Sequence, residues 1–140
     1  GCARQYSRML APGAASSRHA SALTAAVGAA AQRVAEGSRG EGIVHGDLVA
    51  ANLLEGKAVW LLDWEYAQVA DPLYDVACLL AYHPAARPHA RPLLAAAGLE
   101  AASDAVRLKA AIEVYEGLTA LWWLARGAPL PAGGRGELAG

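Results

Sequence analysis

Apolar residues recur at helical spacing in three parts of the 140-residue chain. Side chains three and four positions apart share one face of a helix, so this spacing is typical of amphipathic helices. The pattern predicts helices over residues 19–36, 71–82 and 103–126, and a shorter one over 92–97. The apolar faces of the three long helices are formed by Leu23, Val27, Ala30 and Val34, by Leu73, Val76, Ala77 and Leu80, and by Leu108, Ile112, Tyr115, Thr119 and Trp122.

The segment between the first two helices has a different pattern. After a short apolar entry at residues 43–44, two stretches rich in strand-forming residues, 52–55 and 58–64, flank a tight turn that contains Gly56. This arrangement predicts a β-hairpin. Trp60, in the second strand, is expected in the core. The chain is therefore expected to be mainly α-helical with one short β-hairpin.

Glycine and proline divide the chain further. Residues 37–42 contain three glycines and are expected to end the first helix. Gly117 lies inside the last predicted helix, where glycine costs about 1 kcal/mol relative to alanine, which indicates a close contact or a kink. Residues 1–18 are interpreted as a lead-in, 19–127 as the folded domain, and 128–140 as a flexible tail.

The amino-acid composition mainly excludes several classes of protein. Alanine accounts for 35 residues and inflates the hydrophobic fraction, but that fraction, 55%, still excludes a disordered chain. Two cysteines are too few for a disulfide scaffold, and Cys78 is expected to be a small buried side chain. A net charge of −1 indicates no nucleic-acid surface, and neither a membrane span nor a signal peptide is visible. We therefore expect a cytoplasmic protein without nucleic-acid or membrane partners; the oligomeric state cannot be read from the sequence.

Side chains suited to chemistry gather between residues 43 and 77. His45, Asp47 and Asn52 follow the spacing H-x-D-x-x-x-x-N, and Asp63 ends the predicted hairpin. Hard cations such as Mg²⁺ bind oxygen ligands and keep substrate phosphates in their shell. A free carboxylate beside such an ion can orient and deprotonate a hydroxyl group. These are the parts that phosphoryl transfer requires.

The strings HGDLVAANLL and LLDWEYAQVADPLYDVA resemble the catalytic core of the aminoglycoside phosphotransferase and choline kinase family, relatives of the protein kinases. They are especially similar to its bacterial choline kinase-like and thiamine kinase-like members. The resemblance implies that Asp47 is the catalytic base, and that Asn52 and Asp63 bind the cofactor as Mg²⁺ ligands. It also implies that His45 braces the catalytic loop and that Asp75 holds the loop backbone from below.

The implied fold is that of a kinase-like C-terminal lobe, with residues 43–77 as its catalytic segment. Asp63 is followed by Trp64 and Glu65, where protein kinases have D-F-G, and Trp64 is expected to pack where that Phe packs. The implied activity is transfer of the γ-phosphoryl group of ATP to a small-molecule hydroxyl, with Mg²⁺ as cofactor. Choline, another amino alcohol or thiamine is the first expectation for the acceptor, and an aminoglycoside is the next.

The family's N-terminal ATP-clamping lobe, with its sheet, nucleotide-covering loop and lysine, is not visible in the residues before His45. The two lysines, Lys57 and Lys109, lie in the predicted turn and the last helix. The chain is therefore either a fragment of a longer kinase, which we favour, or a truncated, non-catalytic pseudokinase-like binding module. A metal-dependent hydrolase that uses His45 and Asp47 is disfavoured, because clustered histidine ligands are lacking.

Several further residues have two interpretations. Glu65 either reaches the metal or substrate, or is a solvated acid. Tyr115, Trp122 and Trp123 either line a pocket for a cationic substrate through cation–π attraction, or pack in the core. Asp71, which precedes a proline, is expected to cap the second helix.

Overall fold

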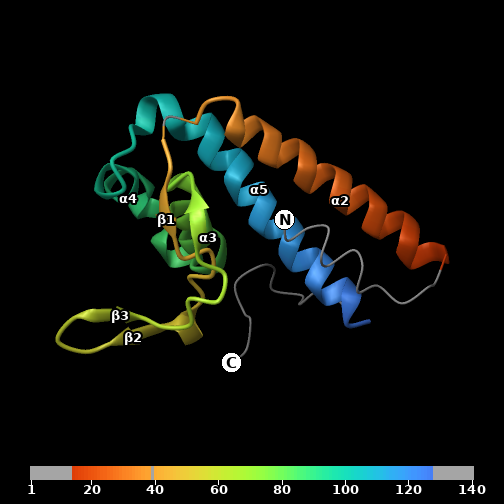
Figure 1. Cartoon of the computed structure of the whole chain (residues 1–140), viewed down its shortest axis with the longest axis horizontal. Helices are drawn as coiled ribbons and strands as arrows, with labels where there is room; N and C mark the ends of the chain where they lie inside the picture. Colours follow the sequence, from red (N-terminus) through yellow and green to blue (C-terminus); the bar gives the residue numbers. More distant parts are fainter. Residues whose placement is uncertain (1–13, 39, 128–140) are drawn as a thin grey trace.

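The computed structural model describes residues 14–38 and 40–127. Within them lie helices α2 (Ala14–Ala35), α3 (Leu73–Tyr82), α4 (Ala90–Ala96) and α5 (Ala101–Ala125), with two short 3₁₀ helices, η1 (Ala50–Asn52) and η2 (Pro84–His89) (Figure 1). The mainly helical fold is confirmed, and every predicted helix is present. The α2 helix begins inside the predicted lead-in; the rest of that lead-in, and the predicted tail over 128–140, lie outside the described residues.

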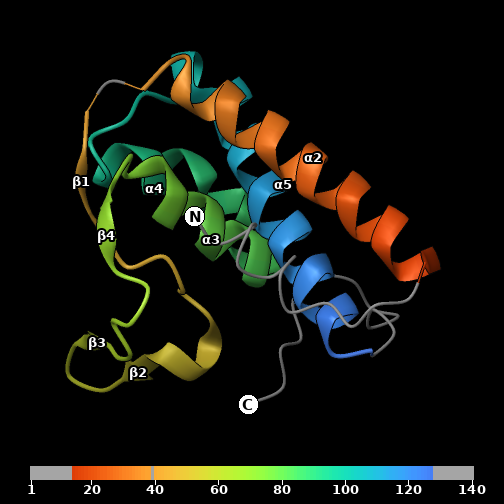
Figure 2. The ribbon, with the colours of Figure 1, turned by 45° about the vertical axis from the view of Figure 1, so that its right-hand side comes forward.

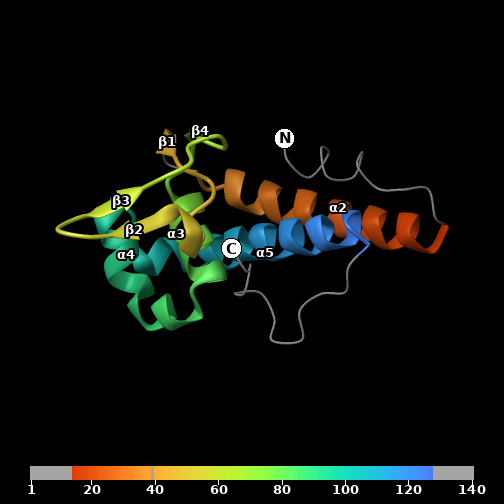
Figure 3. The same ribbon diagram turned by 90° about the horizontal axis from the view of Figure 1, so that it is seen from below.

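The two longest helices, α2 and α5, lie side by side along most of their length (Figure 1 and Figure 3). Val27 and Ala30 of α2 pack against Val114 and Leu121 of α5. Gly117 makes this close approach possible, because a Cβ atom at this position would lie 2.3 Å from Cγ2 of Val27. The predicted close contact at Gly117 is thus confirmed.

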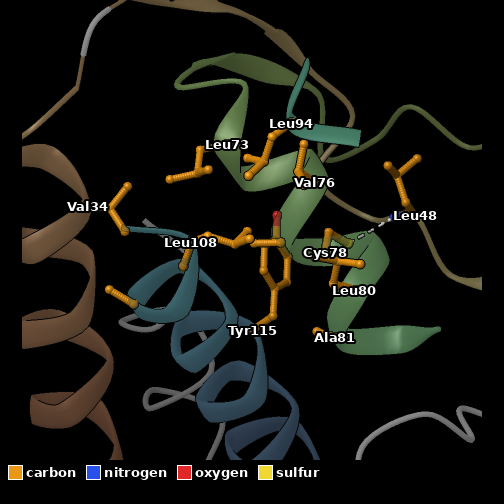
Figure 4. Packing of buried hydrophobic residues seen from close by; sticks show 13 residues of the cluster. Val34, Leu48, Leu73, Val76, Cys78, Leu80, Ala81, Leu94, Leu108 and Tyr115 are labelled. Atoms are coloured by element: carbon orange, nitrogen blue, oxygen red, sulfur yellow. Dashed lines mark hydrogen bonds between the residues drawn. The ribbon is translucent and has the colours of Figure 1, made fainter. Parts of the chain in front are cut away.

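A second apolar cluster joins α3 to α5 and α4 (Figure 4). Its centre is the buried face of α3, where Leu73 and Leu80 are almost fully buried. Tyr115 and Leu108 of α5 pack against this face, together with Leu48 from the loop after β1. Through Leu48, the cluster therefore anchors the loop after β1 in the core.

The strands form two separate antiparallel pairs. Strand β1 (Gly42–Val44) pairs with β4 (Gln68–Ala70), beside α3 and α4 (Figure 2), and β2 (Leu53–Glu55) pairs with β3 (Val59–Leu61) as the predicted hairpin. The sequence analysis did not predict β4, because three residues are too few to show a strand pattern.

The hairpin corrects one expectation. Trp60 was expected in the core, yet it is 63% exposed, because the β2–β3 hairpin projects from the helices and leaves all of β3 exposed (Figure 1). Other exposed large apolar side chains gather in the same part of the chain: among the described residues, all except Val106 lie between positions 43 and 69. We refer to these side chains as the exposed apolar residues; they are Ile43, Leu54, Val59, Trp60, Leu61, Leu62, Trp64, Tyr66 and Val69.

A buried arginine joins the ends of three elements. Arg107 of α5 donates from Nε to the carbonyl oxygen of Val34 at 3.1 Å, and its guanidinium group pairs with the carboxylates of Asp71 and Asp104. Asp71 also accepts the N–H of Leu73, the first residue of α3, at 2.9 Å, so its carboxylate pairs with a donor at the helix start as predicted, although the N-cap residue itself is Pro72. None of the helices in the described ranges is long and apolar enough to cross a membrane.

Candidate active site

Asp47, the predicted base, and Asn52, a predicted Mg²⁺ ligand, are in contact. The loop that follows β1 carries Asp47 and enters η1, whose last residue is Asn52. The side-chain amide of Asn52 donates to the Asp47 carboxylate at 3.0 Å and to the Asp47 carbonyl oxygen at 2.9 Å. The five-residue spacing thus brings the two side chains together across one turn of 3₁₀ helix.

Asp75, in the first turn of α3, holds the start of this loop. Its two carboxylate oxygens accept the backbone N–H groups of His45, at 2.8 Å, and Gly46, at 2.9 Å. Gly46 has a φ of +81°, and a Cβ atom there would lie 3.1 Å from the carbonyl oxygen of Tyr66. The loop therefore turns sharply at a position where a side chain would be both strained and crowded.

His45 links the two halves of the site. It is 1% exposed; its Nδ1 accepts the N–H of Asp47 at 3.3 Å, and its Nε2 lies 2.8 Å from the carbonyl oxygen of Leu62. A carbonyl oxygen only accepts, so Nε2 carries the proton and Nδ1 is free to accept. The ring of Trp64 packs at 4.7 Å from the ring of His45. His45 thus tethers the Asp47 loop to the residue before Asp63.

Asp63 lies just after β3, in an unusual backbone conformation. Its φ of +57° is in the left-handed region, which aspartate tolerates better than most residues. The preceding residue, Leu62, donates its N–H to the carbonyl oxygen of Asn52 at 2.9 Å. Such conformations often occur at functional sites, where surrounding contacts hold them in place.

The electrostatic environment changes the acidity of Asp47. Partial burial raises the pKa of its carboxyl group, the Asn52 hydrogen bond and His45 lower it, and the charges of Asp63 and Glu65 raise it further. The net effect is a raised pKa. Two predicted site acids therefore lie near enough to act on Asp47, and the shift brings this carboxylate closer to the pKa range of an effective general base.

The donor set suits a hard cation that is shared with a substrate. Among the described residues, no group of three histidine, cysteine or acidic side chains is arranged to hold a metal ion. Mg²⁺, however, is usually bound by one or two protein oxygen ligands together with substrate phosphates. Asn52, whose amide nitrogen is committed to Asp47, retains its carbonyl oxygen as a ligand, and Asp63 supplies a carboxylate. These two side chains could hold Mg²⁺.

The aromatic candidates lie elsewhere. Tyr115 is 7% exposed and packs edge-on against Tyr74 and Tyr82, which supports its interpretation as a core residue. The ring of Trp122 lies 5.0 Å from that of Trp123, and the guanidinium carbon of Arg126 lies 3.7 Å from the Trp122 ring centre. These tryptophans are on the last turns of α5, which lie apart from the β2–β3 hairpin (Figure 1 and Figure 3). The structure does not bring them to the Asp47 loop.

Two residues that the sequence analysis did not connect with the site do contact its loop. The N–H of Leu48 donates to Sγ of Cys78 at 3.1 Å, and Nε2 of His83 lies 2.8 Å from the Leu48 carbonyl oxygen. Cys78 was expected only to be a buried side chain, which it is, and His83 attracted no prediction. Their contacts depend on the packing of α3 under the loop, so no local pattern indicates them.

Comparisons with known proteins identify the family and the fold of the chain. Residues 2–112 match the family model described as "Phosphotransferase enzyme family". The crystal structure of choline kinase LicA from Streptococcus pneumoniae superposes with a TM-score of 0.68 at 19% identity, over 90% of this chain and 46% of that one. LicA in complex with AMP gives a TM-score of 0.65 at 20% identity, over 90% and 45% of the two chains.

At this level of identity, the likeness to the solved structures shows the fold alone, and this chain spans about half the length of the choline kinase. A search of curated protein sequences found no match. The family match, in contrast, covers most of the chain and includes the whole segment from His45 to Asp75. The chain belongs to the phosphotransferase enzyme family.

Proposed function

We propose that this chain carries the catalytic loop of a kinase that transfers the γ-phosphoryl group of ATP to a hydroxyl group of a small molecule. The observation that carries the proposal is the hydrogen-bonded pair of Asp47 and Asn52, on a loop that Asp75 and His45 hold in place. Family membership supports the phosphotransferase class, and the arrangement of these side chains supports the finer assignment.

Each residue then has a defined task. Asp47 accepts the proton of the acceptor hydroxyl while that oxygen bonds to the γ-phosphorus and the bond to the ADP oxygen breaks. Asn52 and Asp63 would hold Mg²⁺, which supplies neutralisation of the phosphate charge. The raised pKa of Asp47 supports its role, because a more basic carboxylate takes up a hydroxyl proton more readily.

A cationic alcohol suits this site best. Asp47, Asp63 and Glu65 place three acids near one another, which favours a positively charged acceptor. Choline, other amino alcohols, thiamine and the polycationic aminoglycosides all meet this requirement; we keep choline, another amino alcohol or thiamine as the first class of acceptor and an aminoglycoside as the next. The similar solved structure is described as a choline kinase, which supports the same order.

The exposed apolar residues before and after Asp63 in the chain support a two-part enzyme. Large apolar side chains exposed in such number within one part of a chain often contact a ligand or another polypeptide. Because this chain spans 46% of the choline kinase, the remaining nucleotide-gripping part of the enzyme would be supplied by polypeptide outside these 140 residues. We propose that such a part and the nucleotide together cover the exposed apolar residues.

The test is ATP-dependent phosphorylation of choline, ethanolamine, thiamine and kanamycin by the full-length gene product. Asp47→Asn is expected to lower turnover by about 10²–10⁴-fold, with nucleotide binding and circular dichroism retained. Glu55→Gln is the matched control, because it removes an exposed acid from the hairpin and should leave turnover unchanged.

Unchanged turnover in Asp47→Asn would overturn the assignment of the base. If the gene product binds nucleotide but neither phosphorylates any of these acceptors nor hydrolyses ATP, the non-catalytic binding module becomes the better description. A preference for kanamycin over choline, ethanolamine and thiamine would reverse the proposed order of acceptors and leave the kinase assignment in place.

A further inference from the structure

Leu48, the residue directly after Asp47, has both of its backbone polar groups held by side chains from the α3 region. Its N–H donates to Sγ of Cys78 at 3.1 Å, a contact drawn in Figure 4, and its carbonyl oxygen lies 2.8 Å from Nε2 of His83. The Leu48 side chain is buried in the core cluster around α3. A loop residue is thus fixed at three points, all of them by groups outside its own loop.

The same pattern extends over the whole start of the loop. The N–H groups of His45 and Gly46 donate to Asp75, that of Asp47 donates to His45, and that of Leu48 donates to Cys78. Four consecutive backbone donors therefore end on side chains rather than on regular secondary structure. The position of the loop relative to α3 depends on these contacts, because a short irregular segment has no hydrogen-bond ladder of its own.

Cys78 is suited to hold the Leu48 N–H, and its thiol is not suited to reactive chemistry. Burial raises the pKa of its thiol to about 12, so the sulfur stays protonated and unreactive near neutral pH. It also contacts the hydroxyl of Tyr115, so the sulfur lies between the core and the loop. Sulfur is a weak acceptor, so the position of the Leu48 N–H depends on the packing around Cys78 as well as on the hydrogen bond itself.

His83 follows the last residue of α3, and it acts on the other side of Leu48. A carbonyl oxygen accepts only, so Nε2 of His83 is the donor in this hydrogen bond. Its contact does not depend on charge, because Nε2–H is available in the neutral tautomer as well as in the imidazolium form. Cys78 and His83 together therefore fix the directions of the two peptide units on either side of the Leu48 Cα atom.

We propose that Cys78 and His83 are positioning residues, which orient the Asp47 carboxylate toward Asn52 by holding Leu48. The catalytic consequence of this inference rests on the proposed function of Asp47; the structural consequence does not. The competing interpretation is that Cys78 only fills the core and that His83 only ends a helix.

The single asparagine of the chain provides a direct readout. Selective ¹⁵N-asparagine labelling gives one side-chain NH₂ signal, from Asn52, and its chemical shift reports the hydrogen bonds to Asp47. We expect Cys78→Ala and His83→Leu to move this signal and to speed hydrogen exchange of the Leu48 amide several-fold. Cys78→Ser and His83→Gln, which retain an acceptor and a donor, should restore both measurements toward wild type.

Matched controls separate positioning from loss of stability. Val76→Ala removes buried methyl groups from the same helix, and His89→Leu removes an exposed histidine from η2. Both should leave the Asn52 signal in place, even where Val76→Ala lowers the free energy of unfolding. An unmoved Asn52 signal in folded His83→Leu, or in folded Cys78→Ala, would overturn the proposal for that residue, and His83→Leu decides the matter if Cys78→Ala fails to fold.

Turnover of the full-length gene product gives the catalytic consequence. Displacement of a catalytic group by about 1 Å can cost about 10²-fold in rate, so His83→Leu should lower kcat by up to that factor with little change in KM for ATP. An absence of turnover in the wild-type protein would contradict the proposed function, while the Asn52 signal would still test the positioning role. A lowered kcat with an unmoved signal would assign the loss to another cause and overturn the proposal.

Discussion

Oδ1 of Asp75 accepts the backbone N–H of Gly46 at 2.9 Å, one residue before the proposed base. Asp75 precedes Cys78 by one helical turn, so α3 touches the loop at successive positions along one side. The site therefore depends on a helix that contributes no side chain to the proposed chemistry.

Replacement of Asp75 by asparagine should loosen the loop without unfolding the protein. One acceptor oxygen is lost, and the new NH₂ group faces a backbone N–H, so the free energy of unfolding should fall by about 2 kcal/mol. Urea unfolding measures the loss, and hydrogen exchange should show faster exchange at His45 and Gly46 than in α5. Exchange that increases equally in all elements would contradict this local role.

Asp47→Asn should stabilise the fold near neutral pH, although it removes the proposed base. The pKa of Asp47 is raised in the folded protein, mainly by burial, so the fold binds this proton more tightly than the unfolded chain does. Wild-type stability therefore falls as the pH rises from the ordinary value of 3.8 through the raised pKa, whereas the variant lacks this loss.

Urea unfolding at several pH values checks this expectation. The advantage of Asp47→Asn over wild type should be largest above the raised pKa and should disappear below pH 3.8. An advantage that is independent of pH would point to a packing effect instead. Glu55→Gln, in the exposed hairpin, is the control for removal of one negative charge.

Two glycines in helices should respond to alanine in opposite directions. Gly117→Ala places a methyl group against Val27, whose branched side chain has little freedom to move away, and should cost about 1–3 kcal/mol. Gly28→Ala meets no atom within 4 Å and should gain about 1 kcal/mol from helix propensity. Thermal and urea unfolding measure both; recovery of stability in Gly117→Ala with Val27→Ala would confirm the clash.

Arg107→Met should be among the most destabilising substitutions in the chain. It leaves the carboxylates of Asp71 and Asp104 buried without their partner, at a cost of about 3–5 kcal/mol. The exposed pair of Arg33 and Glu113 is the control, and Arg33→Gln should change stability by no more than about 1 kcal/mol. Equal effects of the two variants in urea unfolding would contradict the structural role of Arg107.

The sequence predicted the features that depend on local pattern. Helical periodicity located α2, α3 and α5, and the glycine turn located the β2–β3 hairpin. The motif spacing also selected Asp47 and Asn52, which the structure places in contact.

The remaining features depend on packing between distant segments. Cys78 lies 30 residues from Leu48, and Arg107 lies 36 residues from Asp71, so no local pattern could reveal either contact. Trp60 was placed in the core because alternation alone cannot show whether another layer covers a hairpin. The same limit applies to β4, whose partner β1 lies about 25 residues earlier in the chain.

The contacts of Arg107 also determine the shortest part of the chain that can hold the Asp47 loop in its position. Its three partners are Val34 at the end of α2, Asp71 before α3 and Asp104 at the start of α5. A peptide cut down to residues 43–77 would retain every proposed catalytic side chain, yet it would release Asp71, the entrance of α3 and, with them, the position of Asp75. The catalytic segment is therefore not a transplantable motif, and the smallest portable unit extends from α2 into α5.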